Sequence, residues 1–537
     1  RERGALGVAG QGPVGLERAG EGAVRDHREG PGGSETGSGA GARPASSRVR
    51  SDGRCDDITP GLFWILLALV VYMPFEEFLL KWLPVSDQVY GLARLGSEAL
   101  VYCLLVTVVL GRLAQGRFLR RTPIDWPLLV FVVLAGVSIA INGSQVLPAL
   151  VTLRTLLRYV ALFYVVTNLE LDERRIRILL LAILATAVLE SGIALLQFAQ
   201  GGPTAFWFPR ASDLEVGGVG RNFSILTGGV EAGAVIGTFG HTVSLALFLL
   251  VAAVVVTGIL FTQGDRVPRF MAPGWLFALL GVFLTGILLT YSRAAFLGAL
   301  IGLGVAAWWR RHRREVIRPL TGLAVGGLFL AAVLALTANV GQANLKRTHV
   351  SPLENVRMTF GSQVFQGGFS NTRVWILTAV GGTVLRSMTP LGYGPDQETA
   401  RRKIAARAHG TLDRLLTYGP FEDVFWIAML SYYGIVGLGV FVWLLVRLFT
   451  VAREAMRYKP GLWTRTAATS CAVLLVLLVP LTFLIRTFEY RSLALYFWLL
   501  AGITVNRLER VRAWRAALAG GTEGEARGDL PGPASPS

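Results

Sequence analysis

The chain repeats one pattern from residue 61 to residue 506, in which long apolar stretches alternate with shorter polar connections. An α-helix rises 1.5 Å per residue, so about 20 apolar residues cross the roughly 30 Å hydrocarbon core of a bilayer. The sequence therefore predicts an all-α fold, a polytopic membrane helix bundle of about twelve transmembrane helices. The predicted spans cover residues 61–80, 96–111, 125–141, 147–167, 176–198, 240–261, 274–290, 294–309, 319–338, 424–449, 467–485 and 490–506.

The composition agrees with an integral membrane protein. Of 537 residues, 53% are hydrophobic and 16% are charged, whereas a soluble protein of this size carries more charge. The net charge of +17 comes largely from basic clusters on alternate loops. Because such clusters stay on the cytoplasmic side of a membrane, the charge is explained by topology and requires no nucleic acid. The clusters lie at residues 112–121, 174–177, 266–269, 310–318, 447–465 and 507–515.

An even number of spans places both termini on the same side of the membrane, and the basic clusters place that side in the cytoplasm. The sequence therefore predicts a multi-pass protein of the cytoplasmic (inner) membrane with both termini cytoplasmic. We expect the short outer loops at 142–146 and 486–491 to carry few charges, in keeping with this topology. The first residues are rich in Gly, Ser, Arg and Glu and lack apolar periodicity, which predicts disorder. We expect a disordered cytoplasmic tail (1–57), transmembrane helices 1–9 (58–338), a large extracytoplasmic loop (339–423), helices 10–12 (424–506) and a cytoplasmic tail (507–537).

The loop at 339–423 is long for a connection in a compact bundle, so it is either functional or disordered. It contains ten Lys or Arg residues against six Asp or Glu. The positive-inside rule does not place such a basic segment outside the membrane. The charge therefore indicates either a solvated helix face or an anionic substrate.

Several ionisable residues lie within the predicted spans. Each costs about 2.5–3.5 kcal/mol at a helix centre if unpaired, so they should face the bundle interior or a hydrated cavity. Arg154 and Arg158 lie one helical turn apart and share a face. They form either a structural ion pair with Glu190 or Glu98, or a cationic cavity lining for an anionic lipid headgroup.

A hinge between two spans carries Arg293, in the sequence Thr-Tyr-Ser-Arg-Ala-Ala-Phe-Leu-Gly from 290 to 298. Arginines follow the second span, so Arg293 should lie at the outer face. It is either an interfacial anchor that extends to water or a functional residue. Gly298 and Gly302 form a Gly-x-x-x-Gly pattern, which favours close helix packing.

Four further motifs accompany this hinge. They are Gly-Thr-Phe-Gly-His at 237–241, Arg-Val-Trp at 373–375, Pro-Leu-Gly-Tyr-Gly at 390–394 and Tyr-Gly-Ile-Val-Gly-Leu at 433–438. In this order, with the long loop between the ninth and tenth spans, the set resembles the signatures of the O-antigen ligase and O-antigen polymerase (WaaL and Wzy) family. The motifs cover roughly residues 225–440.

The resemblance implies a glycosyltransferase of cell-envelope polysaccharide or lipopolysaccharide synthesis. Such an enzyme moves a glycan from an undecaprenyl-diphosphate-linked donor to an acceptor sugar hydroxyl, with inversion, on the outer face of the membrane. It implies no metal and no other cofactor. Besides membrane lipids, the partners are the lipid-linked donor and an acceptor glycan or glycolipid. The sequence leaves open whether the product is a capped lipid or a lengthened polymer.

Site residues follow from the same resemblance. Arg293, a functional residue in the family, and Arg373 are candidates to bind the diphosphate, and Arg221 is nearest to an arginine that family members carry before Gly-Thr-Phe-Gly-His. Where the family has a catalytic histidine, this chain has Asp423, with Glu422 beside it, and a carboxylate can serve as general base. His241 is either a helix-entry residue or a ligand.

Two other classes remain open. One is a transporter of an anionic or lipid-linked solute, although the sequence lacks the internal repeats that such proteins show. The other is an inactive scaffold of glycan assembly, favoured by the aspartate at the position of the histidine.

Overall fold

The structure is a computed structural model that describes residues 58–82, 89, 92–202, 215–216, 219–220, 234–262, 272–310, 376–387, 389–407, 424–457 and 461–519. These residues are almost wholly helical, as predicted. The exception is a two-residue antiparallel pair, β1 (Glu215–Val216) with β2 (Val219–Gly220), in which Glu215 lies opposite Gly220. The expected tail at 1–57 and most of the loop at 339–423 lie outside the described residues. Of the expected tail at 507–537, residues 507–519 are helical instead, as the end of a helix that starts at Arg491, and residues 520–537 lie outside the described residues.

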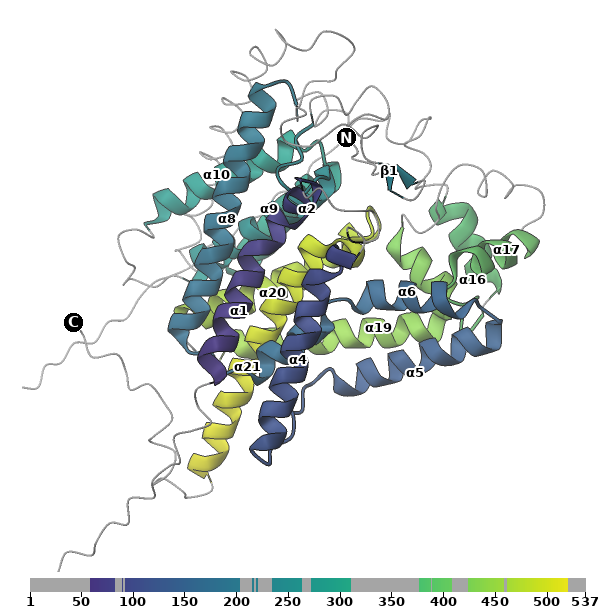
Figure 1. Cartoon of the computed structure of the whole chain (residues 1–537), viewed down its shortest axis with the longest axis horizontal. Helices are drawn as coiled ribbons and strands as arrows, with labels where there is room; N and C mark the ends of the chain where they lie inside the picture. The colour runs from purple at the N-terminus through teal and green to yellow at the C-terminus, as the bar shows by residue number, and fades with distance from the viewer. Residues whose placement is uncertain are drawn as a thin grey trace, which may run out of the picture. The chain divides into compact units, whose positions relative to one another are not determined.

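The helices follow the apolar stretches closely (Figure 1). In chain order they are α1 (Ile58–Tyr72), a 3₁₀ turn (Met73–Phe75), α2 (Glu76–Trp82), α4 (Gly96–Ala114), α5 (Asp125–Asn142), α6 (Val146–Leu157), α7 (Val160–Asn168), α8 (Glu173–Ala199), α9 (Thr242–Thr262), α10 (Pro273–Leu289) and α11 (Arg293–Arg310). After the loop come a π-helical turn (Ile376–Val380), α16 (Gly381–Ser387), α17 (Gln397–Arg407), α19 (Phe425–Arg457), α20 (Leu462–Leu481), a 3₁₀ turn (Thr487–Glu489) and α21 (Arg491–Ala519).

Seven helical segments in the described part are long and apolar enough to cross a membrane. They are Pro60–Leu80, which joins α1 to α2, and helices α4, α5, α8, α9, α19 and α20. An eighth is obtained if α6 and α7, bent by 43°, count as one broken span. Helices α10 and α11 are apolar but shorter, and the predicted span at 319–338 lies outside the described residues. The chain is therefore a helical membrane protein, and the total of about twelve spans stays a prediction.

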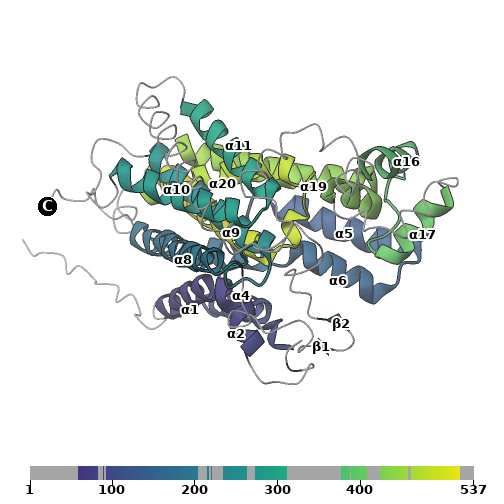
Figure 2. The same cartoon turned by 90° about the horizontal axis from the view of Figure 1, so that it is seen from above.

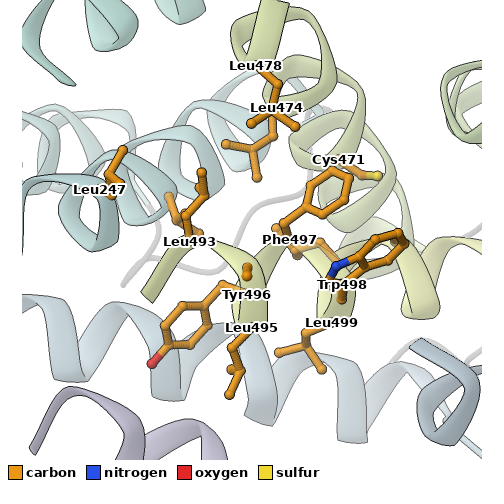
Figure 3. Close-up of a cluster of buried hydrophobic side chains, with 14 of the residues drawn as sticks. Leu247, Cys471, Leu474, Leu478, Leu493, Leu495, Tyr496, Phe497, Trp498 and Leu499 are labelled. Carbon is orange, nitrogen blue, oxygen red and sulfur yellow. The ribbon is translucent and has the colours of Figure 1, made fainter. Parts of the chain in front are cut away.

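Helix α9 forms the centre of the bundle. Its residues from Leu245 to Ile259 are all buried, which fits a helix that is apolar around its whole circumference. It packs against α8, α10, α11, α20 and α21. Figure 3 shows Leu247 of α9 in one buried cluster with leucines of α20 and the aromatic residues Tyr496, Phe497 and Trp498 of α21.

The predicted Gly-x-x-x-Gly packing site is confirmed. A Cβ at Gly298 would lie 2.9 Å from the Leu481 side chain, and one at Gly302 would lie 2.9 Å from Leu477. Both leucines belong to α20, so the two glycines allow α11 and α20 to approach closely.

Basic loops far apart in the sequence meet at one end of the bundle, which we call the basic end. Arg112 Nη2 at the end of α4 donates to the carbonyl of Asn168, and Arg507 of α21 pairs with Glu173 at the start of α8. Glu173 also accepts from the backbone of Trp463 at the start of α20. Helices α4, α7, α8, α20 and α21 thus share this end, as expected if it is the cytoplasmic face.

Helices α5, α6 and α19 lie side by side away from α1 and α8 (Figures 1 and 2). Helices α16 and α17, from the large loop, lie at their far ends. Lys403 Nζ of α17 donates to the carbonyl of Asn142, 2.7 Å away, at the end of α5. Part of the predicted outer loop is therefore folded onto the helical bundle.

Candidate functional site

A buried group of arginines and carboxylates lies at the end of α4 opposite the basic end. Its centre is Glu98, whose side chain is 2% exposed. Arg154 Nε donates to Glu98 Oε2 at 2.9 Å, and Arg158 Nε lies 2.9 Å from Glu98 Oε1. Arg491 Nη2 lies 3.6 Å from the same oxygen. Three guanidinium groups therefore converge on one carboxylate.

Arg491 joins this group to a second buried carboxylate. Its Nη1 atom lies 3.2 Å from Glu76 Oε2 and also donates to the carbonyl of Arg94 at 2.7 Å. Glu76 accepts a further hydrogen bond from Ser97, at 3.1 Å. We call Glu76, Glu98, Arg154, Arg158 and Arg491 the outer charge cluster. With three arginines and two glutamates it carries one excess positive charge.

The bend between α6 and α7 sets the position of two of these arginines. Arg154 lies in the last turn of α6, and Arg158 follows its last residue. The helix axis then turns by 43° before α7 continues towards the basic end. Arg158 Nη1 also donates to the carbonyl of Glu489, at 3.3 Å. The bend thus carries both arginines towards α4 and the start of α21.

The Gly-Thr-Phe-Gly-His motif is held by side chains of α8. Gln197 Oε1 accepts from the backbone N–H groups of Ile236 and Gly237 at 3.0 and 2.9 Å, and its Nε2 donates to the Gly237 carbonyl. Glu190 accepts from the backbone N–H of Thr238 at 3.0 Å and contacts its hydroxyl group. Gly237 has a φ of 55°, and a Cβ there would overlap the Glu190 carboxylate. The position therefore requires glycine.

The motif that contains Arg293 lies beside this segment. Val235 N–H donates to the carbonyl of Leu289 at 3.2 Å, which joins the backbone segments that directly precede the two motifs. Tyr291 adopts the left-handed conformation, with a φ of 59°, and thus ends α10 and redirects the chain into α11. Burial raises the pKa of Tyr291 to about 12, so its phenol stays protonated at neutral pH. Arg293, half-buried, is the first residue of α11.

The Pro-Leu-Gly-Tyr-Gly motif meets the start of α19. Tyr393 N–H donates to the Ser431 carbonyl at 2.7 Å, and Gly394 N–H donates to the Tyr432 carbonyl at 3.1 Å. In return, Val436 N–H donates to the Pro390 carbonyl at 3.1 Å. We call these three hydrogen bonds the motif clamp. They form at a break in α19, where the chain leaves helical geometry.

That break is at Gly434, with φ 69° and ψ −171°. This conformation is essentially restricted to glycine. A Cβ at Gly434 would overlap the backbone of the loop motif, and one at Gly392 would lie 2.5 Å from the Gly434 nitrogen. The glycines of two separate motifs are therefore needed where their backbones cross.

The turn between α20 and α21 joins the motif pairs to the outer charge cluster. Phe425 N–H donates to the Thr482 carbonyl at 3.0 Å, and Phe488 packs on Phe425 with ring centroids 5.4 Å apart. Tyr490 lies against His241, at 5.8 Å. The cluster and both motif pairs are therefore neighbours at the end away from the basic end.

The structure answers some of the site predictions. The ion pair of Arg154 and Arg158 is with Glu98; the alternative partner, Glu190, is wrong because it binds Thr238 instead. His241 Nδ1 accepts from the Val243 N–H at 3.2 Å at the start of α9, a contact that a helix-entry residue makes. The remaining candidates, Arg221, Arg373, Glu422 and Asp423, lie outside the described residues.

Sequence reasoning missed Arg491. The loop at 486–491 was expected to carry few charges, yet Arg486, Glu489 and Arg491 all lie there. Arg491 makes ion pairs with both buried glutamates, and Arg486 pairs with Glu489 at 3.4 Å. The available signal was an arginine at the first turn of an apolar helix, where the charge either reaches water or pairs with a carboxylate.

No protein-family model matches this chain, and no curated protein is detectably similar to it in sequence. The functional assignment therefore depends on the motifs and their geometry.

Proposed function

We propose that the protein is a polysaccharide ligase or polymerase of the cytoplasmic membrane. It transfers a glycan from an undecaprenyl-diphosphate donor to an acceptor sugar hydroxyl at the outer face, with inversion and without a metal. In this proposal the chain has about twelve spans and cytoplasmic termini. The basic end faces the cytoplasm, and the outer charge cluster faces the donor.

The observation that supports the proposal most is the meeting of motifs in pairs. The hydrogen bond from Val235 to Leu289 joins the residues directly before the 237–241 motif to the residue directly before the Arg293 hinge, and the motif clamp joins the 390–394 motif to the 433–438 motif and the two residues before it. Backbone contact between the matching segments is what we expect of a family signature that forms one site.

The position of Arg293 fits a role at the outer boundary. Helix α11 starts at Arg293 and packs near its beginning on Leu481, the last residue of α20. Helix α20 starts at the basic end, so Arg293 lies at the other end. Cleavage of a sugar–phosphate bond develops negative charge on the diphosphate, which arginines stabilise by bidentate, charge-assisted hydrogen bonds. We assign this role to Arg293 and Arg373, with Arg221 as a further contact.

The acceptor hydroxyl needs a general base within hydrogen-bond reach. In this proposal Asp423 takes that role, or Glu422 beside it. Asp423→Asn keeps the size of the side chain and removes the base. We expect that it abolishes turnover while binding of the lipid-linked donor persists; unchanged turnover would remove Asp423 from the mechanism.

The decisive experiment reconstitutes the full chain in vesicles with a diphosphate-linked oligosaccharide and an acceptor glycan. We expect the glycan to move to the acceptor or to lengthen. Arg293→Ala should abolish transfer, and Arg402→Ala is the matched control because that arginine of the outer loop is 64% exposed. Normal product from folded Arg293→Ala protein would contradict its assigned role.

One observation favours transport as the second candidate. Helix α6–α7 is broken by 43° with Arg154 and Arg158 at the break, and discontinuous helices with charges at the break are common in transporters. The same vesicles distinguish the two functions. A transporter would carry the intact lipid-linked glycan across the bilayer without any change in glycan length or acceptor.

A further inference from the structure

Glu190 of α8 is a buried carboxyl group without a cationic partner among the described residues. Its side chain is completely buried, and no Lys or Arg in this part of the chain lies within ion-pair distance of it. The buried glutamates Glu76 and Glu98, in contrast, each pair with an arginine. Glu190 follows Glu173 by 17 residues, about 25 Å along a helix that is long and apolar enough to be a span. An ionised carboxylate is costly in such a place, and a carboxyl group takes up a proton instead.

The hydrogen bonds around Glu190 also require a proton on its carboxyl group. Thr238 Oγ1 contacts Glu190 Oε1 and lies 2.8 Å from the carbonyl oxygen of Pro74. A threonine hydroxyl group has one hydrogen to donate, and the Pro74 carbonyl can only accept. Whichever acceptor takes that hydrogen, an ionised Glu190 would leave two acceptor oxygens facing each other without a hydrogen between them. A hydrogen on Glu190 Oε1 satisfies both contacts, since Glu190 then donates to Thr238 and Thr238 donates to Pro74.

The neighbouring residue Gln197 shows the same pattern in a neutral side chain. Its Oε1 accepts from the N–H groups of Ile236 and Gly237, and its Nε2 donates to the Gly237 carbonyl at 2.9 Å. Glu190 Oε2 accepts from the Thr238 N–H at 3.0 Å, and a protonated Oε1 donates to the hydroxyl group of the same residue. Each side chain then offers the segment one donor and one acceptor, as a neutral clamp on buried backbone should.

The elements around Glu190 bring no positive charge to it. Helices α1, α9, α10 and α20 pack on α8. Helices α9 and α10 contain no ionisable residue, and the other charged residues of α8 lie in its first turns. The ionisable residues of the remaining neighbours are Tyr72 of α1, Arg465 and Cys471 of α20 and Tyr496 of α21. Arg465 lies in the first turn of α20, at the basic end, and Tyr496 donates its hydroxyl hydrogen to the Val70 carbonyl at 2.8 Å.

We propose that Glu190 is protonated in the folded protein and that its proton holds the 237–241 motif on α8 and on the turn between α1 and α2. We call the chain of hydrogen bonds from Glu190 through Thr238 to Pro74 the proton latch. When the latch opens, the proton passes to water and the carboxylate that remains can no longer donate to Thr238.

Release of this proton is tied to release of the motif. The Glu190 carboxyl group is completely buried and lies against Gly237, where a Cβ would overlap it. The proton can therefore reach water only when the segment moves away from α8. High pH favours this open form, and the hydrogen bond from Val235 to Leu289 carries the change to the residue directly before the Arg293 hinge. The motif is thus a pH-sensitive element of the outer half of the bundle.

The first test is infrared spectroscopy of the full chain in detergent at neutral pH. A protonated carboxyl group has a C=O stretching band that carboxylates lack, so we expect this band in the wild-type protein and not in Glu190→Gln. Glu77→Gln is the matched control and should leave the band unchanged, because it removes a carboxyl group that is paired with Arg94. Thr238→Val removes the acceptor of the proton and should shift the band to higher frequency, which assigns it to Glu190 independently.

The second test compares the unfolding of the wild-type protein and Glu190→Gln from about pH 5, where an unfolded glutamate is ionised, to about pH 9. Glutamine supplies the donor and the acceptor that the proton latch needs, so Glu190→Gln should be at least as stable at neutral pH. A carboxyl group that is protonated when folded and ionised when unfolded binds one more proton in the folded state, so stability falls as pH rises. The wild-type folding constant should therefore fall relative to that of Glu190→Gln, by up to about tenfold per pH unit.

Three results would overturn the proposal. One is the absence of the protonated-carboxyl band from the wild-type protein at neutral pH. Another is a loss of stability in Glu190→Gln as large as that in Glu98→Gln, which removes a carboxylate shared by three arginines. The third is the same dependence of unfolding on pH in the wild-type protein and in Glu190→Gln. None of these readouts depends on glycan transfer.

Discussion

Replacement of Gly434 by alanine tests whether the motif clamp holds the 390–394 motif on the bundle. Gly434 has φ 69° and ψ −171°, a conformation that costs a non-glycine residue about 1–3 kcal/mol. The added methyl group would also overlap backbone atoms, with the Pro390 carbonyl carbon 2.5 Å away. Overpacking of this kind costs about 1–3 kcal/mol. Backbone cannot rotate out of the way as a side chain can.

The protein can lower this cost of roughly 2–6 kcal/mol by releasing the loop motif. Release sacrifices the three hydrogen bonds of the motif clamp, at about 0.5–1.5 kcal/mol each. The smaller of these two costs, strain with the loop motif in place or loss of the hydrogen bonds on its release, determines the change in stability. We therefore expect Gly434→Ala to lower the free energy of unfolding by about 2–4 kcal/mol. In addition, the amides of Tyr393 and Gly394 should exchange faster with solvent.

Gly439→Ala is the matched control for Gly434→Ala. Gly439 lies on the same helix and is exposed, and a Cβ at this position would meet no atom within 4 Å. Alanine there should be neutral or stabilise the helix by up to about 1 kcal/mol. The assays are thermal unfolding in detergent and hydrogen exchange over residues 389–396. Equal unfolding midpoints and equal exchange for the two variants would refute the reasoning.

Two further substitutions test the buried contacts. Glu98→Gln leaves three arginines without their shared carboxylate and should lower the free energy of unfolding by about 3–5 kcal/mol. Glu77→Gln, which breaks a more exposed ion pair, should lower it by at most about 1 kcal/mol. Similar losses for the two variants in denaturant unfolding would contradict a central role for Glu98. Gly302→Leu should destabilise the packing of α11 on α20 by about 1–3 kcal/mol. Gly304→Leu is the control and should not destabilise this packing, because Gly304 is exposed and a Cβ there would meet no atom within 4 Å. Thermal unfolding of both variants measures the difference.

The positions of the helices could be predicted because lipid forces the backbone to satisfy its own hydrogen bonds. The span predicted at 96–111 corresponds to helix α4 (Gly96–Ala114), and the span predicted at 125–141 corresponds to helix α5 (Asp125–Asn142). The break in the span at 147–167 could not be predicted. It contains no Gly or Pro between Ala149 and Asn168, so the bend depends on contacts of Arg154, Arg158 and their partners.

Ion pairs of the site could be predicted from the sequence only where few carboxylates are possible partners for a given arginine. Glu98 was one of two carboxylates considered for Arg154 and Arg158, and the choice between Glu98 and Glu190 depends on how helices pack. The ion pairs of Arg491 could not be predicted because this residue lies at a helix start, where an arginine usually reaches water. In the structure α2 and α4 cover that start, so Arg491 is buried against Glu76 instead.

The turn between α20 and α21 couples the two motif pairs. Thr482 holds Phe425 at the start of α19, and Tyr490 contacts His241 at the start of α9. Arg491, directly after Tyr490, is fixed in turn by both buried glutamates. Because these groups have little access to water that could replace a lost partner, moving one motif pair costs interactions at the other. If Arg293 and the loop bind one donor, the charge cluster therefore acts as the rigid base that keeps their two motif pairs in register.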